Sequence, residues 1–159
     1  MKKLALFSIL TLLILGCRKT KLKDEYSILE GKWKWVSAKE IRTVLSNGNT
    51  SYYSHNASDY PDEYYIEFDR KGKVRFFKND NIESSYRVVI NSFSGDCNIF
   101  PGCHSFGIRL DNNKKDLPFI GYVGYDTLLC SSQNTNLPLI YHVDDDYSYD
   151  YQHKFVKVN

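Results

Sequence analysis

Residues 64–77 read YYIEFDRKGKVRFF, and this stretch decides the class of fold. Apolar residues alternate with polar or charged ones on both sides of residues 69–72, which is the period of a half-buried β-strand. The four residues between the two runs read DRKG, with a glycine where a tight turn needs a positive φ. The stretch therefore predicts two antiparallel strands joined by a hairpin.

The same alternation recurs along the chain, at roughly ten-residue spacing. Further alternating runs lie at 33–36, 85–90, 106–111, 119–125, around Cys130 and at 153–158, while residues 24–30 are the one helix candidate. Residues 79–81 and 111–113 are asparagine-rich and predict turns, because asparagine tolerates the left-handed region. The pattern predicts an all-β sandwich or closed barrel, and closure removes the edges that would pair with other chains.

Two stretches do not alternate. Residues 46–62 are polar and rich in tyrosine, and they predict a long loop; residues 134–150 predict an insertion before the last strand. Because tyrosine offers a rigid contact area with a polar tip, the tyrosines of these stretches suit recognition, although tyrosine is also ordinary strand material. They are Tyr52, Tyr53, Tyr60, Tyr147, Tyr149 and Tyr151.

The first 16 residues form a leader. A basic start is followed by a short apolar run at 4–15, which is too short to cross a bilayer and is typical of a secretory signal. The run ends LILG before Cys17, which resembles the lipobox of bacterial lipoproteins. The resemblance implies lipidation of Cys17, a tether at 17–27 and a folded domain at 28–159, held at the cell envelope and most simply at the outer membrane, on its periplasmic or surface face. The alternative is an ordinary cleaved signal.

The charge balance argues against one class of partner. The chain has 159 residues, with 21 Lys and Arg against 19 Asp and Glu. Lys2 and Lys3 lie in the leader, so its removal leaves 19 basic and 19 acidic residues. A neutral body does not favour nucleic-acid binding.

Three cysteines remain if Cys17 carries lipid. An exported protein can form disulfides, and a turn-like stretch separates Cys97 from Cys103, so we favour that pair and expect Cys130 to be a buried thiol. Pairing of Cys130 with either of the others stays open. A zinc site at Cys97, Cys103 and His104 is the rival, but the spacing is not that of a structural zinc site, so we expect no metal.

The motif GKWKWVS at 31–37 follows the short helix candidate and resembles the Gly-X-Trp opening of the lipocalins. The hairpin FDRKGKV at 68–74 and the final run FVKV at 155–158 are similar to parts of small bacterial lipocalin-like lipoproteins. The resemblance implies an eight-stranded antiparallel up-and-down barrel whose base closes around Trp33. It also implies a basic residue near the chain end packed on that tryptophan, here Lys154 or Lys157.

Such a barrel can be filled by side chains or can hold one small ligand. An aromatic interior would suit a small hydrophobic ligand. We expect the interior, and the ligand site, to be lined by Trp35, Tyr64, Ile66, Phe68, Phe76, Tyr86, Ile108, Phe119 and Tyr125. If side chains fill the barrel, the alternative is a protein-interaction or inhibitor module that uses the tyrosine-rich loops.

Residues that could carry catalysis are scattered. The sequence has no nucleophile elbow, no His-Glu-X-X-His motif and no phosphate-binding glycine loop. His55, His104, His142 and His153 are isolated, and the acids at 144–146 lack the spacing of a calcium loop. We therefore expect a binding protein with no catalytic residues and no cofactor.

Overall fold

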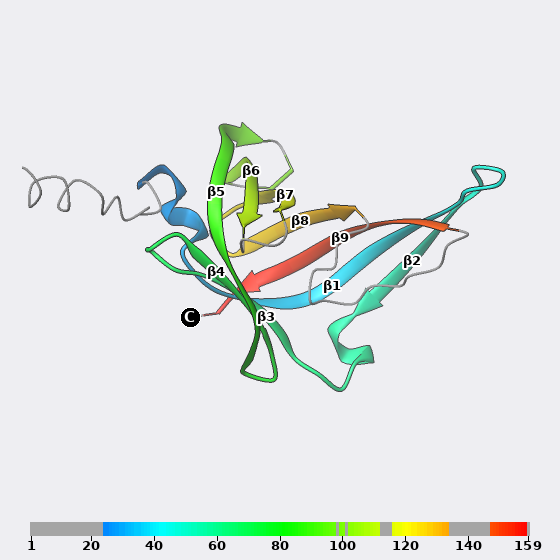
Figure 1. The fold of residues 1–159 in the computed structure, drawn as a ribbon, viewed down its shortest axis with the longest axis horizontal. Coiled ribbons are helices and arrows are strands. Elements are labelled where there is room, and N and C mark those ends of the chain that lie inside the picture. The colour runs from blue at the N-terminus through cyan, green and yellow to red at the C-terminus, as the bar shows by residue number, and fades with distance from the viewer. Residues whose placement is uncertain (1–23, 98, 101, 112–115, 134–146, 159) are drawn as a thin grey trace, which may run out of the picture.

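The computed structural model describes residues 24–97, 99–100, 102–111, 116–133 and 147–158 (Figure 1). In these residues the chain forms two short 3-10 helices and nine strands. Their bounds are η1 Asp24–Leu29, β1 Gly31–Val44, β2 Thr50–Asn56, η2 Ala57–Asp59, β3 Tyr64–Phe68, β4 Lys73–Lys78, β5 Asn81–Cys97, β6 Cys103–Asp111, β7 Asp116–Val123, β8 Thr127–Gln133 and β9 Tyr147–Lys157.

The sheet closes into a barrel. Strands β3 to β9 pair antiparallel in chain order, and β1 pairs with both β3 and β9, so eight strands form a closed ring. The predicted all-β class and the closed eight-stranded barrel are confirmed. Closure gives each of these eight strands a partner on both sides. The ring therefore has no edge strand that could pair with another chain, which is the advantage expected of a closed barrel.

Strand β2 adds a ninth member outside the ring. It pairs with the second half of β1, from Ser37 to Thr43, whereas β3 pairs with the first half, from Gly31 to Lys34. Figure 1 shows β1, β2 and β9 running side by side as a long ribbon away from β5 to β7. The prediction of one long loop at 46–62 is therefore wrong. All residues of β2 except His55 are exposed, so no apolar alternation marks the strand in the sequence.

The predicted hairpins lie where the turn residues indicate. Gly72 has φ +75° in the turn between β3 and β4. Asn79 and Asp80 have φ values of +48° and +63° in the turn between β4 and β5. Residues 112–115 of the third predicted turn, and 134–146 of the predicted insertion, lie outside the described residues, but β9 begins at Tyr147, inside the stretch expected to be irregular.

The base of the barrel closes around Trp33. Its ring is fully buried, and its Nε1–H donates to the carbonyl of Leu29 at 2.9 Å. The Lys157 ammonium lies 5.0 Å from the ring centre, so the expected basic residue on this tryptophan is Lys157. Gly31 has φ +122°, and a Cβ there would lie 3.2 Å from Lys157 Cε, which explains why β1 begins with a glycine.

The inner face of the barrel is packed. A register shift between Trp35 and Ser37 in the β1–β9 pairing is the signature of a bulge, and it brings Ala38 and Glu40 onto the inner face after Trp33 and Trp35. The buried cluster draws on η1 and on the strands around the ring. It comprises Leu29, Trp33, Trp35, Ala38, Ile66, Phe68, Val74, Phe76, Tyr86, Val88, Phe106, Ile108, Leu110, Val123, Leu128, Cys130 and Phe155.

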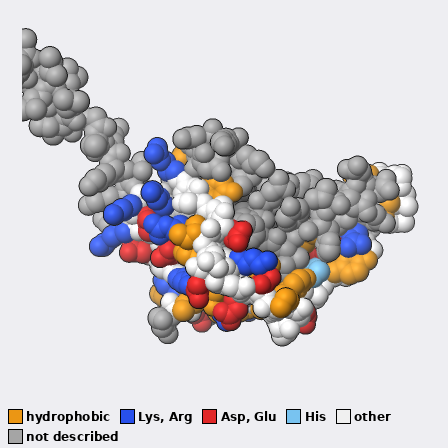
Figure 2. All heavy atoms as spheres, turned by 60° about the horizontal axis from the view of Figure 1, so that its bottom comes forward, with side chains coloured by type: hydrophobic (Ala, Val, Ile, Leu, Met, Phe, Trp, Pro, Cys, Tyr) orange, Lys and Arg blue, Asp and Glu red, His pale blue; other side chains and the backbone are white. Residues whose placement is uncertain are grey.

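Charges of both signs are mixed over the visible described surface (Figure 2). Lysines and arginines of β1 and β4 pair with carboxylates, as in Lys32–Asp80 at 2.9 Å and Lys78–Asp62 at 2.9 Å. Such exposed pairs contribute little stability. In the described part of the chain, no helix has the length and apolar character needed to cross a membrane.

Candidate functional site

A cavity of about 610 Å³ lies on the outer face of the sheet, across five adjacent strands. Its lining comes from β2, β1, β9, β8 and β7, together with one residue of the turn between β5 and β6. The residues are Ser37, Ala38, Lys39, Ser54, His55, Asn56, Ile99, Tyr122, Leu129, Cys130, Ser131, Gln152 and Lys154. Ligand sites commonly have volumes of about 300–1,000 Å³.

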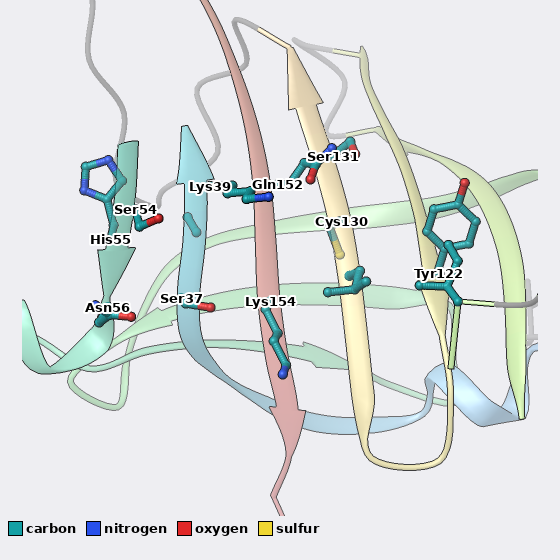
Figure 3. A pocket seen from close by; sticks show the side chains of 13 residues that line it. Ser37, Lys39, Ser54, His55, Asn56, Tyr122, Cys130, Ser131, Gln152 and Lys154 are labelled. Carbon is teal, nitrogen blue, oxygen red and sulfur yellow. The ribbon is translucent and has the colours of Figure 1, made fainter. Parts of the chain in front are cut away.

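Strand alternation decides which side chains face this cavity. Ala38, Cys130 and His153 are buried on the inner face, so their neighbours along each strand point outward. Lys39, Ser131, Gln152 and Lys154 are correspondingly exposed. Figure 3 shows Tyr122 at one end of the cavity and Ser54 with His55 at the other.

The cavity is polar and basic. Lys39 and Lys154 lie between its two ends (Figure 3). None of the lining residues that the structure describes is an aspartate or glutamate. Hydroxyl and amide groups line the cavity together with the two ammonium groups. They belong to Ser37, Ser54, Asn56, Ser131 and Gln152. These groups can donate to an oxygen-rich ligand, and all except the ammonium groups can also accept.

A second polar group lies on the inner face, beyond the tryptophans. Glu40 has no exposed surface; one of its carboxylate oxygens accepts from Arg42 Nε and Nη2 at 3.1 and 2.9 Å, and the other lies 2.7 Å from His55 Nε2. His55 Nδ1 lies 2.7 Å from the Tyr60 hydroxyl. We call Glu40, Arg42, His55 and Tyr60 the inner polar chain.

Burial is the main cause of the raised pKa of Tyr60, and the nearby Asp59 and Glu40 carboxylates add to it. The phenol therefore keeps its proton at neutral pH. If His55 donates Nε2–H to Glu40, its Nδ1 accepts a hydrogen bond from the Tyr60 hydroxyl. The inner polar chain thus satisfies a buried carboxylate, which is costly to bury without partners.

His153 is buried beside this chain, with 1% of its surface exposed. Its ring stacks on Tyr151 with centres 5.6 Å apart, and Ala38 is its cross-strand neighbour in β1. Burial, and to a smaller extent the proximity of His55, lower the pKa of His153 to about 4. His153 is therefore neutral at physiological pH.

The residues expected to bind a ligand inside the barrel are mostly packed into its core. Six of the nine are buried, namely Trp35, Ile66, Phe68, Phe76, Tyr86 and Ile108. Tyr64 is partly buried and packs against the cluster, with its ring 6.1 Å from that of Trp35. The Phe119 side chain lies outside the described ones.

Tyr125 does not belong to the interior. It is 76% exposed, because β7 ends at Val123 and Tyr125 lies in the turn that follows, where strand alternation no longer applies. Its ring lies close to Gly102 instead, where an added Cβ would be 2.5 Å from Tyr125 Cε2. The prediction of Tyr125 as an interior residue is wrong.

The predicted local disulfide is present. Cys97 and Cys103 are joined, with Cα atoms 5.1 Å apart. Cys130 is free and fully buried, and burial raises the pKa of its thiol well above the ordinary range. Among the described residues no group of three or more His, Cys, Asp and Glu side chains is placed to hold a metal ion.

The tyrosines expected in loops lie largely on strands. Tyr52 and Tyr53 are on β2 and are 70% and 44% exposed, whereas Tyr151 is on β9 and buried. Tyr60 is half-buried in the inner polar chain. Tyr147 and Tyr149 belong to β9, but the structure does not describe their side chains. Cys17, His142 and the acids at 144–146 lie outside the described residues.

Sequence reasoning missed both the outer cavity and the inner polar chain. Each joins residues from separate strands, and no local motif marks either of them. Comparisons with protein-family models, curated proteins and solved structures gave no match. The similarity to lipocalins therefore rests on the three short motifs and on the closed barrel that carries them.

Proposed function

We propose that this chain is a lipid-anchored, lipocalin-like binding protein of the bacterial cell envelope, and that it binds a small ligand without catalysis. The observation that carries the binding role is the 610 Å³ cavity on the outer face of β2, β1, β9, β8 and β7. The barrel interior gives these strands a rigid support, since its aromatic side chains form one buried cluster. A rigid support holds ligand-binding groups in place.

The anchor is supported by the leader and by Cys17 directly after it. Two or more acyl chains hold a protein stably on a membrane, whereas one holds it only marginally. A Cys17→Ser variant should leave the detergent-rich phase in a phase-partition experiment, while the wild type should enter it. Wild-type and variant protein in the same aqueous phase would contradict lipidation.

The binding role can be tested by filling the cavity. Ser131 is exposed on the outer face of β8 and lines the cavity, so Ser131→Trp should occupy the space of a ligand. Ser85 is exposed on β5 and does not line it, which makes Ser85→Trp a matched control. Each mature protein is incubated with the small-molecule fraction of a cell extract and analysed by native mass spectrometry.

We expect the wild type and Ser85→Trp to carry an added small-molecule mass, and Ser131→Trp to lose it. Equal occupancy in all three proteins would place the ligand elsewhere. The absence of any bound mass in the wild type would contradict the binding role and favour a protein-interaction module, for which the exposed Tyr52 and Tyr53 of β2 offer an aromatic surface.

A small hydrophobic ligand inside the barrel is the second candidate, and one observation favours it. Trp35 is 1% exposed, and its Nε1–H has no hydrogen-bond partner among the described residues. The rings of Tyr60 and Tyr64 meet it edge-on at 5.7 and 6.1 Å. A buried donor without an acceptor is costly, and a ligand oxygen would satisfy it. Ser131→Trp should not affect such a ligand, whereas Trp35→Phe should weaken its binding.

A further inference from the structure

We infer that the outer cavity takes a small anionic molecule that also carries hydroxyl groups, such as a phosphorylated or carboxylated sugar. The inference rests on the proposed binding role and adds the chemistry of the ligand. It comes from the charges, the hydrogen-bonding groups and the apolar side chains that this one cavity brings together.

The charge argument depends on two lysines. Lys39 of β1 and Lys154 of β9 both line the cavity, and among the described residues neither forms an ion pair. Two other lysines, Lys32 and Lys78, are instead paired with Asp80 and Asp62. Asp150 precedes Gln152 by two residues on the same face of β9, but it does not line the cavity. Among the described lining residues, therefore, no carboxylate faces the two ammonium groups, which are available to an anion.

The hydrogen-bonding groups suit a ligand with hydroxyls. Ser37, Ser54 and Ser131 supply hydroxyl groups, and Asn56 and Gln152 supply amides. Each of these side chains can both donate and accept, as a ligand hydroxyl can. A bare inorganic anion needs donors only and would leave most of the volume empty, so the cavity favours a larger molecule.

The remaining lining residues add apolar contact. Tyr122 and Leu129 face outward from β7 and β8, and Ile99 lies in the turn between β5 and β6 with 53% of its surface exposed. An aromatic ring beside polar groups can cover the C–H face of a sugar ring while its neighbours bind the hydroxyls. The cavity thus combines two ammonium groups, hydroxyl and amide groups between and beside them, and apolar side chains.

The test is isothermal titration calorimetry on the mature protein with four probes: glucose 6-phosphate, glucuronate, glucose and inorganic phosphate. We expect at least one of the two charged sugars to bind more tightly than glucose and than inorganic phosphate. The sugar phosphate and the sugar acid together show whether the anion is a phosphate or a carboxylate. Raising the ionic strength to about 1 M, where the screening length is about 3 Å, should weaken binding of the charged sugar.

Variants then assign the charge to the two lysines. Lys39→Gln and Lys154→Gln should each raise the Kd for the charged sugar about three- to tenfold, as expected for a charge-assisted hydrogen bond at a partly exposed site. Lys71→Gln is the control, because Lys71 is exposed in the turn between β3 and β4, away from the cavity. It should leave the Kd unchanged.

Three results would overturn the inference: glucose bound as tightly as both charged sugars, no binding of any probe, or an equal loss in the Lys71→Gln control. These failures differ from a failure of the proposed function. A neutral ligand that the wild type retains and Ser131→Trp loses would keep the binding role and reject only its anionic character.

Discussion

Acid should destabilise this protein through His153. The imidazole is buried on the inner face of β9, between Ala38 of β1 and Cys130 of β8, and the pKa of His153 in the folded chain is about 4. The first cause is burial, which disfavours the charged ring, and the second is His55 on β2. In the unfolded chain the same ring has a pKa near 6.5.

The sign follows from proton uptake. Between pH 6.5 and pH 4 the unfolded chain binds a proton at His153 and the folded chain does not, so stability falls as the pH falls through this window. The gap between 6.5 and about 4 corresponds to about 3 kcal/mol, because one pKa unit is worth about 1.4 kcal/mol. Between pH 7.5 and pH 4.5, most of this amount, about 2.5 kcal/mol, should be lost.

Urea denaturation at these two pH values measures the effect. Other groups also titrate, so the useful quantity is the pH-dependent loss of the wild type minus that of His153→Leu. This difference cancels changes in packing that are the same at both pH values. His104→Gln is the control, since His104 lies on β6 and the variant keeps His153; it should retain the full loss.

The reasoning would be refuted if His153→Leu lost as much stability between pH 7.5 and pH 4.5 as the wild type does. That outcome would mean that His153 takes up a proton in the folded chain without cost, so its ring would have to be hydrated or paired with a carboxylate. If His104→Gln lost less stability than the wild type between the two pH values, the loss could not be assigned to His153 alone.

Three other predictions follow from the barrel and its cysteines. Trp33→Ala should lower the free energy of unfolding by about 3–5 kcal/mol, because it removes a fully buried ring from the base; an unchanged melting temperature would contradict this. Breaking the Cys97–Cys103 disulfide with a double serine variant should cost about 2 kcal/mol, since the closed loop is short, as urea denaturation would measure. Cys130 should react with iodoacetamide only in denaturant, since burial keeps the thiol protonated and covered; peptide mapping of labelled native protein would show otherwise.

The strands could be predicted because alternation is a local property. Within the two strands of residues 64–77, buried side chains alternate with more exposed ones, and the buried set Ile66, Phe68, Val74 and Phe76 follows directly from the pattern. The disulfide was accessible because its two cysteines flank one short stretch, and Trp33 at the base was accessible because the short motif around it resembles the opening of the lipocalins. The failure at Tyr125 shows the limit: a pattern that continues through a turn still looks like a strand.

Strand β2 was out of reach because its exposed residues carry no apolar signal and its backbone bonds are made to β1. The inner polar chain was out of reach for a different reason. Glu40 reads as a surface residue in the sequence, and only the bulge after Trp35 turns it inward to meet His55. A one-residue change of register moves every following side chain to the other face.

The sequence by itself determined that this protein is all-β, because alternation and turn residues act over a few residues. The closed barrel with Trp33 at its base followed only from the resemblance to the lipocalins, and the pairing of β1 with β9 decided for it over a sandwich. Only the tertiary structure decided where a ligand could bind. Lys39 and Lys154 are 115 positions apart, and only the pairing of β1 with β9 brings them to one cavity. The physical reason is that a barrel joins its first and last strands, so its surface sites are made of residues that no local pattern connects.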